Sequence, residues 1–269
     1  LLYIGLIGGL FMRLSYMKEY DNILFGFFKF SQKQYLEPLQ AGNLYMNNFK
    51  YFVDLQKRTG EKGMGDIDEV AAIIKNANVT IKRHGTDEIV ASGTAGRLRF
   101  RYQAFLNYPV FCLFTIESDM LEIIDITDDY IETEVKFTEE QKEQMAGHFG
   151  ECALVIPPNA FRERIKEVFD QKGIEYIHNK VQYSDFDINH QERIQAYLSG
   201  DTSLFFKKDI FFEPQREYRF VILNNEVEQN FEINIGDLTE QTGIISTSDL
   251  LNGKYGMRIP RIKPASGTV

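Results

Sequence analysis

The feature that most constrains the fold is the irregular spacing of short, almost wholly apolar runs along the chain. The run at 109–117, PVFCLFTIE, is rich in β-branched and aromatic residues, which is typical of a central strand buried on both faces. Similar runs lie at 22–30 and 152–156. Unequal mixtures of helical and alternating patterns separate them, which excludes the regular strand–helix repeat of a doubly wound sheet. We therefore predict an α+β fold, with a mixed, mostly antiparallel sheet and peripheral helices.

Local signals place the remaining elements. Strands are predicted at 22–30, 43–48, 109–117, 152–156 and 176–183, together with a strand region at 211–223 that Pro214 interrupts. Helices are predicted at 32–40, 49–57, 139–148, 159–172 and 191–198. Thr138 and Gln141 have the spacing of a capping box, and Ser31 is the expected N-cap of the first helix. Residues 78–102 are predicted to form two or three strands with turns at His84-Gly85 and Ala95-Gly96. The charged, Gly-rich stretch 58–68 is predicted to be a surface loop.

The length of 269 residues suits one sizeable core, and we expect a single α+β domain at 22–252. Residues 1–21 are an uncertain N-terminal extension, which we leave out of the fold argument, and 253–269 are expected to be a partly disordered tail. The first residues, LLYIGLIGGLFM, are apolar, but about 20 apolar residues are needed to cross a bilayer. We expect a cytoplasmic protein that makes no contact with a membrane.

Charge and cysteine content exclude several classes of protein. The net charge of −9 argues against non-specific wrapping of nucleic acid, which requires a surplus of Lys and Arg. Cys112 and Cys152 both lie in apolar runs, so no disulfide framework is predicted and a reducing compartment is expected. These two cysteines and the four histidines lack the spacing of known metal sites, so no metal is predicted.

Three arginines, Arg97, Arg99 and Arg101, alternate along one predicted strand and therefore share one side of it. A solvated strand face is the favoured interpretation, and a local basic face is the alternative.

The segment at 205–223, FFKKDIFFEPQREYRFVIL, places polar residues between two apolar runs. Gln215, Glu217 and Arg219 lie at the entrance of its predicted strand. Signatures such as the P-loop, GxGxxG, HExxH and GxSxG are absent from the chain. The simplest interpretation is that Glu217 and Arg219 form an exposed ion pair that contributes little to stability.

Four short motifs resemble the DUF2971 family of bacterial and phage proteins. They are Phe28-Lys29-Phe30, the strand NLYMNN, the acidic loop Gly65-Asp66-Ile67-Asp68-Glu69 and the late Gln-x-Glu-Tyr-Arg motif that begins at Gln215. The resemblance covers 22–223 and implies a bacterial or phage protein with a role in phage–host conflict.

The Gln215-Arg216-Glu217 sequence also resembles the Gln/Glu-x-Glu motif of ADP-ribosyltransferases. This resemblance implies that NAD is the substrate and that Glu217 stabilises the ribosyl cation as the glycosidic bond breaks. Gln215 would orient the acceptor, a protein or a nucleic acid, while Lys29 and Arg219 would bind NAD. Lys29 occupies the first-strand place where that family has Arg or His.

Two other classes of function stay open. A non-enzymatic module would bind a protein partner through an aromatic and acidic surface. A nuclease would bind a divalent cation through Asp66, Asp68 and Glu69, although an acidic, solvated loop is the favoured interpretation of these three residues.

Overall fold

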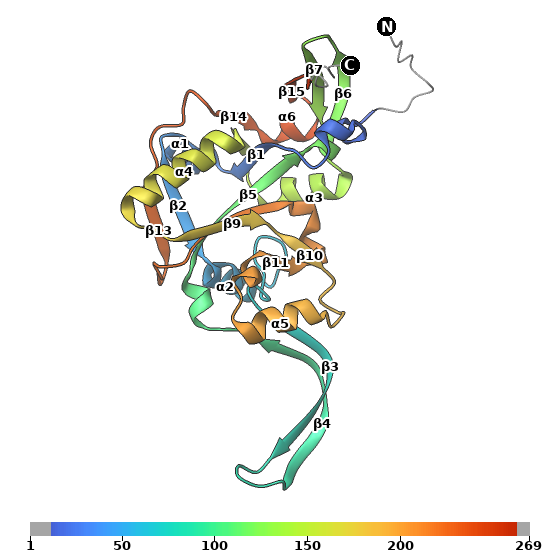
Figure 1. Ribbon diagram of the computed structural model, residues 1–269, viewed down its shortest axis with the longest axis vertical. Coiled ribbons are helices and arrows are strands. Elements are labelled where there is room, and N and C mark those ends of the chain that lie inside the picture. The colour runs from blue at the N-terminus through green and yellow to red at the C-terminus, as the bar shows by residue number, and fades with distance from the viewer. Residues whose placement is uncertain (1–11, 263–269) are drawn as a thin grey trace, which may run out of the picture. The chain divides into compact units, whose positions relative to one another are not determined.

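A computed structural model describes residues 12–262 of the chain (Figure 1). The helices are α1 (Lys33–Gln40), α2 (Phe49–Thr59), α3 (Glu139–His148), α4 (Pro158–Lys172), α5 (Gln191–Ser199) and α6 (Thr247–Leu251). The strands are β1 (Leu24–Ser31), β2 (Asn43–Asn48), β3 (Ala72–Lys82), β4 (Ile89–Phe100), β5 (Pro109–Glu117), β6 (Leu121–Ile126), β7 (Tyr130–Val135), β8 (Cys152–Ile156), β9 (Tyr176–Lys180), β10 (Gln182–Ser184), β11 (Lys207–Asp209), β12 (Glu217–Ile222), β13 (Asn230–Asn234), β14 (Gly243–Ser246) and β15 (Gly256–Pro260). Most strand pairs are antiparallel, so the predicted α+β fold class is confirmed.

The chain divides into two compact units, each made of segments that are distant in the sequence. The first unit comprises Leu1–Asn43, Leu113–Lys166 and Ile235–Val269, and the second comprises Leu44–Cys112 and Glu167–Asn234. Strand β5 and helix α4 each contribute residues to both units.

In the first unit, β1 pairs with the second half of β5 and with β8, and β8 also pairs with β14. The ring of Phe28 on β1 is 6.4 Å from the rings of Phe114 and Phe137 and 5.6 Å from that of Tyr255, measured between centroids. Such aromatic contacts dominate the burial of apolar area in a core. The continuous apolar runs at β1, β5 and β8 are therefore central strands, as their sequences predict.

The first unit also includes parts of both ends of the chain. Leu14 and Tyr20 are fully buried in its core, and the hydroxyl of Tyr20 accepts a hydrogen bond from the Ile262 N–H at 2.7 Å. Leaving 1–21 out of the fold was therefore wrong for its described part. Strand β15 pairs with β7, so the tail contains regular structure. Residues 1–11 and 263–269 lie outside the described residues.

The predicted capping box of α3 is confirmed. The Gln141 N–H donates to the Thr138 hydroxyl at 3.2 Å, and the Thr138 N–H donates to the Gln141 side chain at 3.0 Å. These bonds satisfy donors that the first helical turn leaves unpaired. Helix α1 instead begins after Gln32, because Ser31 still belongs to β1.

In the second unit, β12 pairs with β9, and β2 pairs with the start of β5. Phe49 at the start of α2 stacks on Phe205 with 5.4 Å between ring centroids, and Val221 on β12 is buried in the same cluster. The predicted strand at 211–223 is in fact a 3₁₀ helix, Ile210–Gln215, followed by β12. Pro214 explains the difference, because it lacks the N–H that a strand needs and fits a tight helical turn.

Strands β3 and β4 form one long hairpin (Figure 1). The Arg83 N–H donates to the Glu88 carbonyl at 2.9 Å and closes the turn at the expected place. The second predicted turn, at Ala95-Gly96, is wrong because Ala95 pairs with Ala77 inside the ladder. Within residues 12–262, no helix has both the length and the apolar character needed to span a membrane.

Candidate functional site

The predicted site residues fall into both units. Gln215, Glu217 and Arg219 belong to the second unit, where Gln215 ends the 3₁₀ helix and Glu217 begins β12. Lys29 lies on β1 in the first unit. The geometry below concerns the second unit alone.

Four charged side chains from distant parts of the sequence meet in the interior of the second unit. They are Glu69, Lys208, Glu217 and Arg219, which we call the charge cluster, and all are buried. The two terminal nitrogens of Arg219 donate to both carboxylate oxygens of Glu69 at 2.7 and 3.0 Å, and its Nε donates to Glu217 at 2.8 Å. Lys208 donates to the other oxygen of Glu217 and lies 3.7 Å from Glu69. Two cations therefore neutralise two carboxylates.

Polar neighbours complete the cluster. The Gln215 side-chain amide donates to the Gly63 carbonyl at 2.8 Å, and its oxygen accepts from Lys208 at 3.3 Å. The Tyr183 hydroxyl accepts from the Glu217 N–H at 2.8 Å. Register explains the position of Lys208, because the short parallel pair β10–β11 places it opposite Tyr183. Gln215 thus connects the cluster to the Gly-rich loop at 60–66.

The mutual contacts hold Lys208, Glu217 and Arg219 in their charged forms. Burial alone raises the pKa of Glu217, but Arg219 and Lys208 outweigh it and lower that pKa to about 2. Burial lowers the pKa of Arg219 and of Lys208, but Glu217 and Glu69 outweigh it, so both pKa values lie above their ordinary range. The expectation that Glu217 and Arg219 pair is confirmed, but the pair is buried and not exposed.

Asp66, beside the cluster, behaves differently. One of its oxygens accepts the Asp68 N–H at 2.8 Å, while the other has no hydrogen-bond partner among the described residues. Burial, and next the charge of Glu69, raise the pKa of Asp66 to about 7. At neutral pH this carboxyl group therefore carries its proton for a large part of the time.

Two backbone outliers flank the cluster. Val70, which follows Glu69, has φ of +50°, and Arg216, which precedes Glu217, has φ of +42°. L-residues rarely adopt this region, and a β-branched residue such as Val does so at a clear energetic cost. Such strain persists only where surrounding contacts impose it, and it gathers at functional sites.

The acidic loop also contacts the base of the hairpin. Arg97 and Arg99 both donate to the buried carboxylate of Asp68, the latter at 2.7 Å. Arg101 donates to the backbone carbonyls of Glu69 and Ile67 at 2.8 and 2.6 Å. The three arginines share one side as predicted, and the side chains of Arg97 and Arg99 remain 34% exposed while they bind Asp68. The favoured interpretation of Asp66, Asp68 and Glu69 as a solvated loop is wrong, because all three are buried.

The sequence motifs at 65–69 and 215–219 thus meet in space, but the arrangement is closed and its charges are balanced. Both oxygens of Glu217 accept hydrogen bonds from cations of the same chain. In the part of the chain that the structure describes, no three His, Cys, Asp or Glu side chains are grouped so that they could hold a metal ion.

Sequence reasoning did not single out Lys208. The signal was present, because a lysine inside FFKKDIFF requires a buried countercharge or a route to solvent. Comparison of the chain with protein-family models, with curated proteins and with solved structures gives no match.

Proposed function

We propose that this protein is a binding module that engages another protein through the outer part of the β3–β4 hairpin. We call residues 76–96 the arm. The observation that carries the proposal is the exposure of large apolar side chains there: Ile81, Ile89 and Val90 are 56%, 59% and 59% exposed. Large apolar side chains gathered in the exposed part of one element are a feature of interaction sites.

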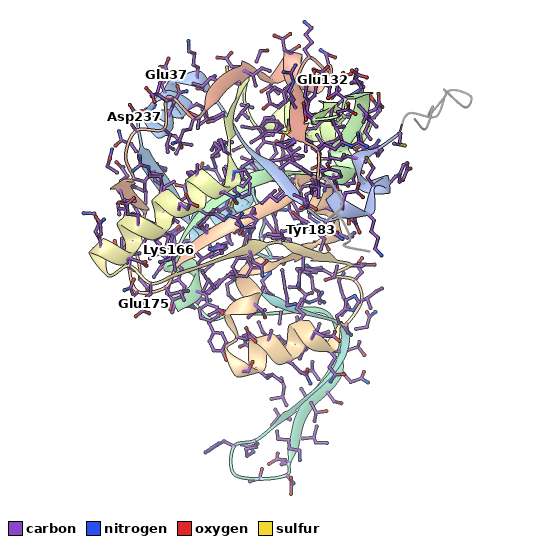
Figure 2. The ribbon with its side chains drawn as sticks, turned by 45° about the horizontal axis from the view of Figure 1, so that its top comes forward. Glu37, Glu132, Lys166, Glu175, Tyr183 and Asp237 are labelled. Atoms are coloured by element: carbon purple, nitrogen blue, oxygen red, sulfur yellow. The ribbon has the colours of Figure 1, made fainter. Side chains whose placement is uncertain are left out.

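The arm extends past α5, and its side chains stand clear of the rest of the second unit (Figures 1 and 2). A two-stranded hairpin is marginally stable in water when it stands alone. An antiparallel ribbon ordinarily packs one face against a core. A bound partner would cover the face of the arm that no core covers within the chain.

The base of the hairpin is braced against the second unit. The Asn189 side chain accepts from the Lys75 N–H at 2.8 Å and donates to the Lys75 carbonyl at 3.0 Å. Arg193 donates to the Ile73 carbonyl at 3.2 Å, and Asp68 binds Arg97 and Arg99. A braced arm loses little conformational entropy when it binds, which favours affinity.

The two faces of the arm differ in polarity. Three cross-strand pairs form an apolar face: Ala77 with Ala95, Val79 with Gly93 and Ile81 with Ala91. Alternate positions form a polar face, with Asn78 opposite Thr94 and Thr80 opposite Ser92. We infer that the partner covers the apolar face.

Site-specific photo-cross-linking tests this function. A benzophenone amino acid at Ile81, on the apolar face, is expected to form a covalent adduct with a protein in the native cell. The same group at Thr80, its neighbour on the polar face, is the matched control and is expected to give much less adduct. Equal yields at the two positions, or no adduct at either, would contradict the proposal.

The meeting of the motifs at 65–69 and 215–219 favours a second candidate, the NAD-dependent ADP-ribosyltransferase that the sequence resemblance implies. Its support is that Glu217 stays ionised beside Gln215, as a carboxylate that stabilises a ribosyl cation must. Calorimetric titration of NAD, together with detection of free nicotinamide, tests it. Both signals should vanish in Glu217→Gln, and their absence from the unaltered protein would exclude this activity.

A further inference from the structure

We propose that the partner covering the apolar face of the arm is a second copy of this chain, which rests on the proposed function above. The two copies pack their arms face to face around a two-fold axis that runs along the arm. The shape and the charges of the arm both support this arrangement.

On the apolar face, the side chains of β3 are large and those of β4 are small. On β3 it carries Val79 and Ile81, which form a ridge, while opposite them on β4 are Gly93 and Ala91, which form a trough. A β-carbon added at Gly93 would meet no atom within 4 Å, so the trough is open. A surface that holds a ridge beside a matching trough is self-complementary.

Only one direction of the two-fold axis brings the ridge of each copy into the trough of the other. An axis along the arm places β3 of each copy over β4 of the other, so each ridge enters the trough of the partner. An axis across the strands would instead place the ridges of the two copies against each other. The geometry therefore also predicts that the two tips point in the same direction.

The charges at the tip fit the same arrangement. Lys82 and Arg83 lie at the end of β3, whereas Asp87 and Glu88 lie just before β4. Within one copy they form exposed pairs, Lys82 with Asp87 and Arg83 with Glu88. By the alternation of side chains, Lys82 lies on the polar face and Arg83 on the side of Ile81, across the turn from Glu88. With β3 over β4, Arg83 of each copy therefore also faces Glu88 of the other. Opposite charges arranged in this way fix register and partner choice.

Charge balance distinguishes the arm from the rest of the chain. The whole chain has a net charge of −9, but the arm carries two cations and two carboxylates, with its histidine neutral. Two copies can thus meet there with little mutual repulsion. The cations at the base, Lys75 and Arg97, are already paired with Asp187 and Asp68 of their own chain.

Charge reversal tests the pairing directly. One variant combines Lys82→Glu with Arg83→Glu, and the other combines Asp87→Lys with Glu88→Lys. We expect the unaltered protein to sediment as a dimer, each variant alone to be a monomer, and an equimolar mixture of the variants to form a heterodimer. A mixture that stays monomeric while the unaltered protein dimerises would overturn the charge arrangement and hence the proposed axis.

A second pair of variants tests the face. Gly93→Arg fills the trough at a position where the added side chain meets open space, so folding should be retained. Ser92→Arg adds the same group to the polar face and is the matched control. We expect the first to abolish dimerisation and the second to leave it intact, with both showing the circular dichroism of the unaltered protein. Dimerisation that survives Gly93→Arg would overturn the proposal.

The cross-linking experiment separates failure of this inference from failure of the proposed function. An unaltered protein that stays monomeric at its highest soluble concentration, together with an Ile81 adduct to a different protein, would overturn the second copy as partner and leave the binding function standing. Absence of any adduct would overturn both.

Discussion

The base and the arm of the β3–β4 hairpin belong to the same two strands but are built in opposite ways. At the base, Arg97 and Arg99 turn inward to the buried carboxylate of Asp68. In the arm, Ile81 and Val90 face solvent. A buried charge is stable only when an opposite charge lies beside it. Exposed apolar surface is stabilised when another surface covers it. The base has its partners within the chain, whereas we propose that those of the arm lie outside it.

The largest effect is expected from Arg219→Ala, which leaves Glu69 and Glu217 buried without their main countercharge. Removing one member of a buried ion pair costs about 3–5 kcal/mol, so the second unit should lose most of its stability. Urea unfolding measures this loss of stability, and far-UV circular dichroism is used to follow it because the chain contains no tryptophan. Lys50→Ala, which breaks an exposed pair outside the arm, is the control and should cause no measurable change. Equal losses in the two variants would mean that the cluster does not stabilise the unit.

Asp68→Asn should have an intermediate effect. It removes the negative charge that Arg97 and Arg99 share, and hydrogen bonds to charged groups contribute about 1.5–3 kcal/mol. Amide hydrogen exchange should become faster at 72–75 and 97–100, the base of the hairpin. Asp187→Asn, at an exposed partner of Lys75, is the control and should leave exchange there unchanged. Unchanged exchange in both variants would show that Asp68 does not brace the hairpin.

Asp66 should produce a pH dependence with a defined sign. Its pKa is about 7 in the folded chain and about 4 in the unfolded chain, so the folded state binds the proton more tightly. The contribution of Asp66 to stability is therefore complete below about pH 4 and is lost as the pH rises through 7. Asp66→Asn should remove this loss, and the variant should be more stable than the unaltered protein at pH 8. A constant stability difference between pH 4 and pH 8 would contradict this.

The smallest effect on stability is expected in the arm itself. Ile81→Thr keeps a β-branched side chain at an exposed position, so in protein diluted until it is monomeric the free energy of unfolding should change by less than about 0.5 kcal/mol. The same substitution at Ile73, which is fully buried on the same strand, should cost several times more. Denaturant midpoints measure both. Similar costs at the two positions would mean that the arm is covered within the chain.

Local patterns predicted the elements better than they predicted burial. The apolar run of β5 and the capping box of α3 depend on neighbours in the sequence, and both were predicted correctly. The turn expected at Ala95-Gly96 was wrong because glycine also occurs within strands whose faces meet open space.

The candidate site was predicted only in part, because its contacts are distant in the sequence. Glu217 and Arg219 were recognised as a pair two residues apart, but their burial depends on Glu69, which is 150 residues from Arg219. No local pattern reveals a partner at that distance. Lys208 was missed for the same reason, since its role is visible only with both carboxylates in place.

The separation between Glu69 and Arg219 also has a consequence for synthesis of the chain. At about 5–20 residues per second, Arg219 is synthesised roughly 8–30 s after Glu69. Throughout that interval Glu69 has no guanidinium to neutralise it, and burying it would be costly. The segment from Leu44 to Cys112 therefore stays incompletely folded during that interval. Its hairpin is synthesised before Asn189 and Arg193, which brace the base of the hairpin.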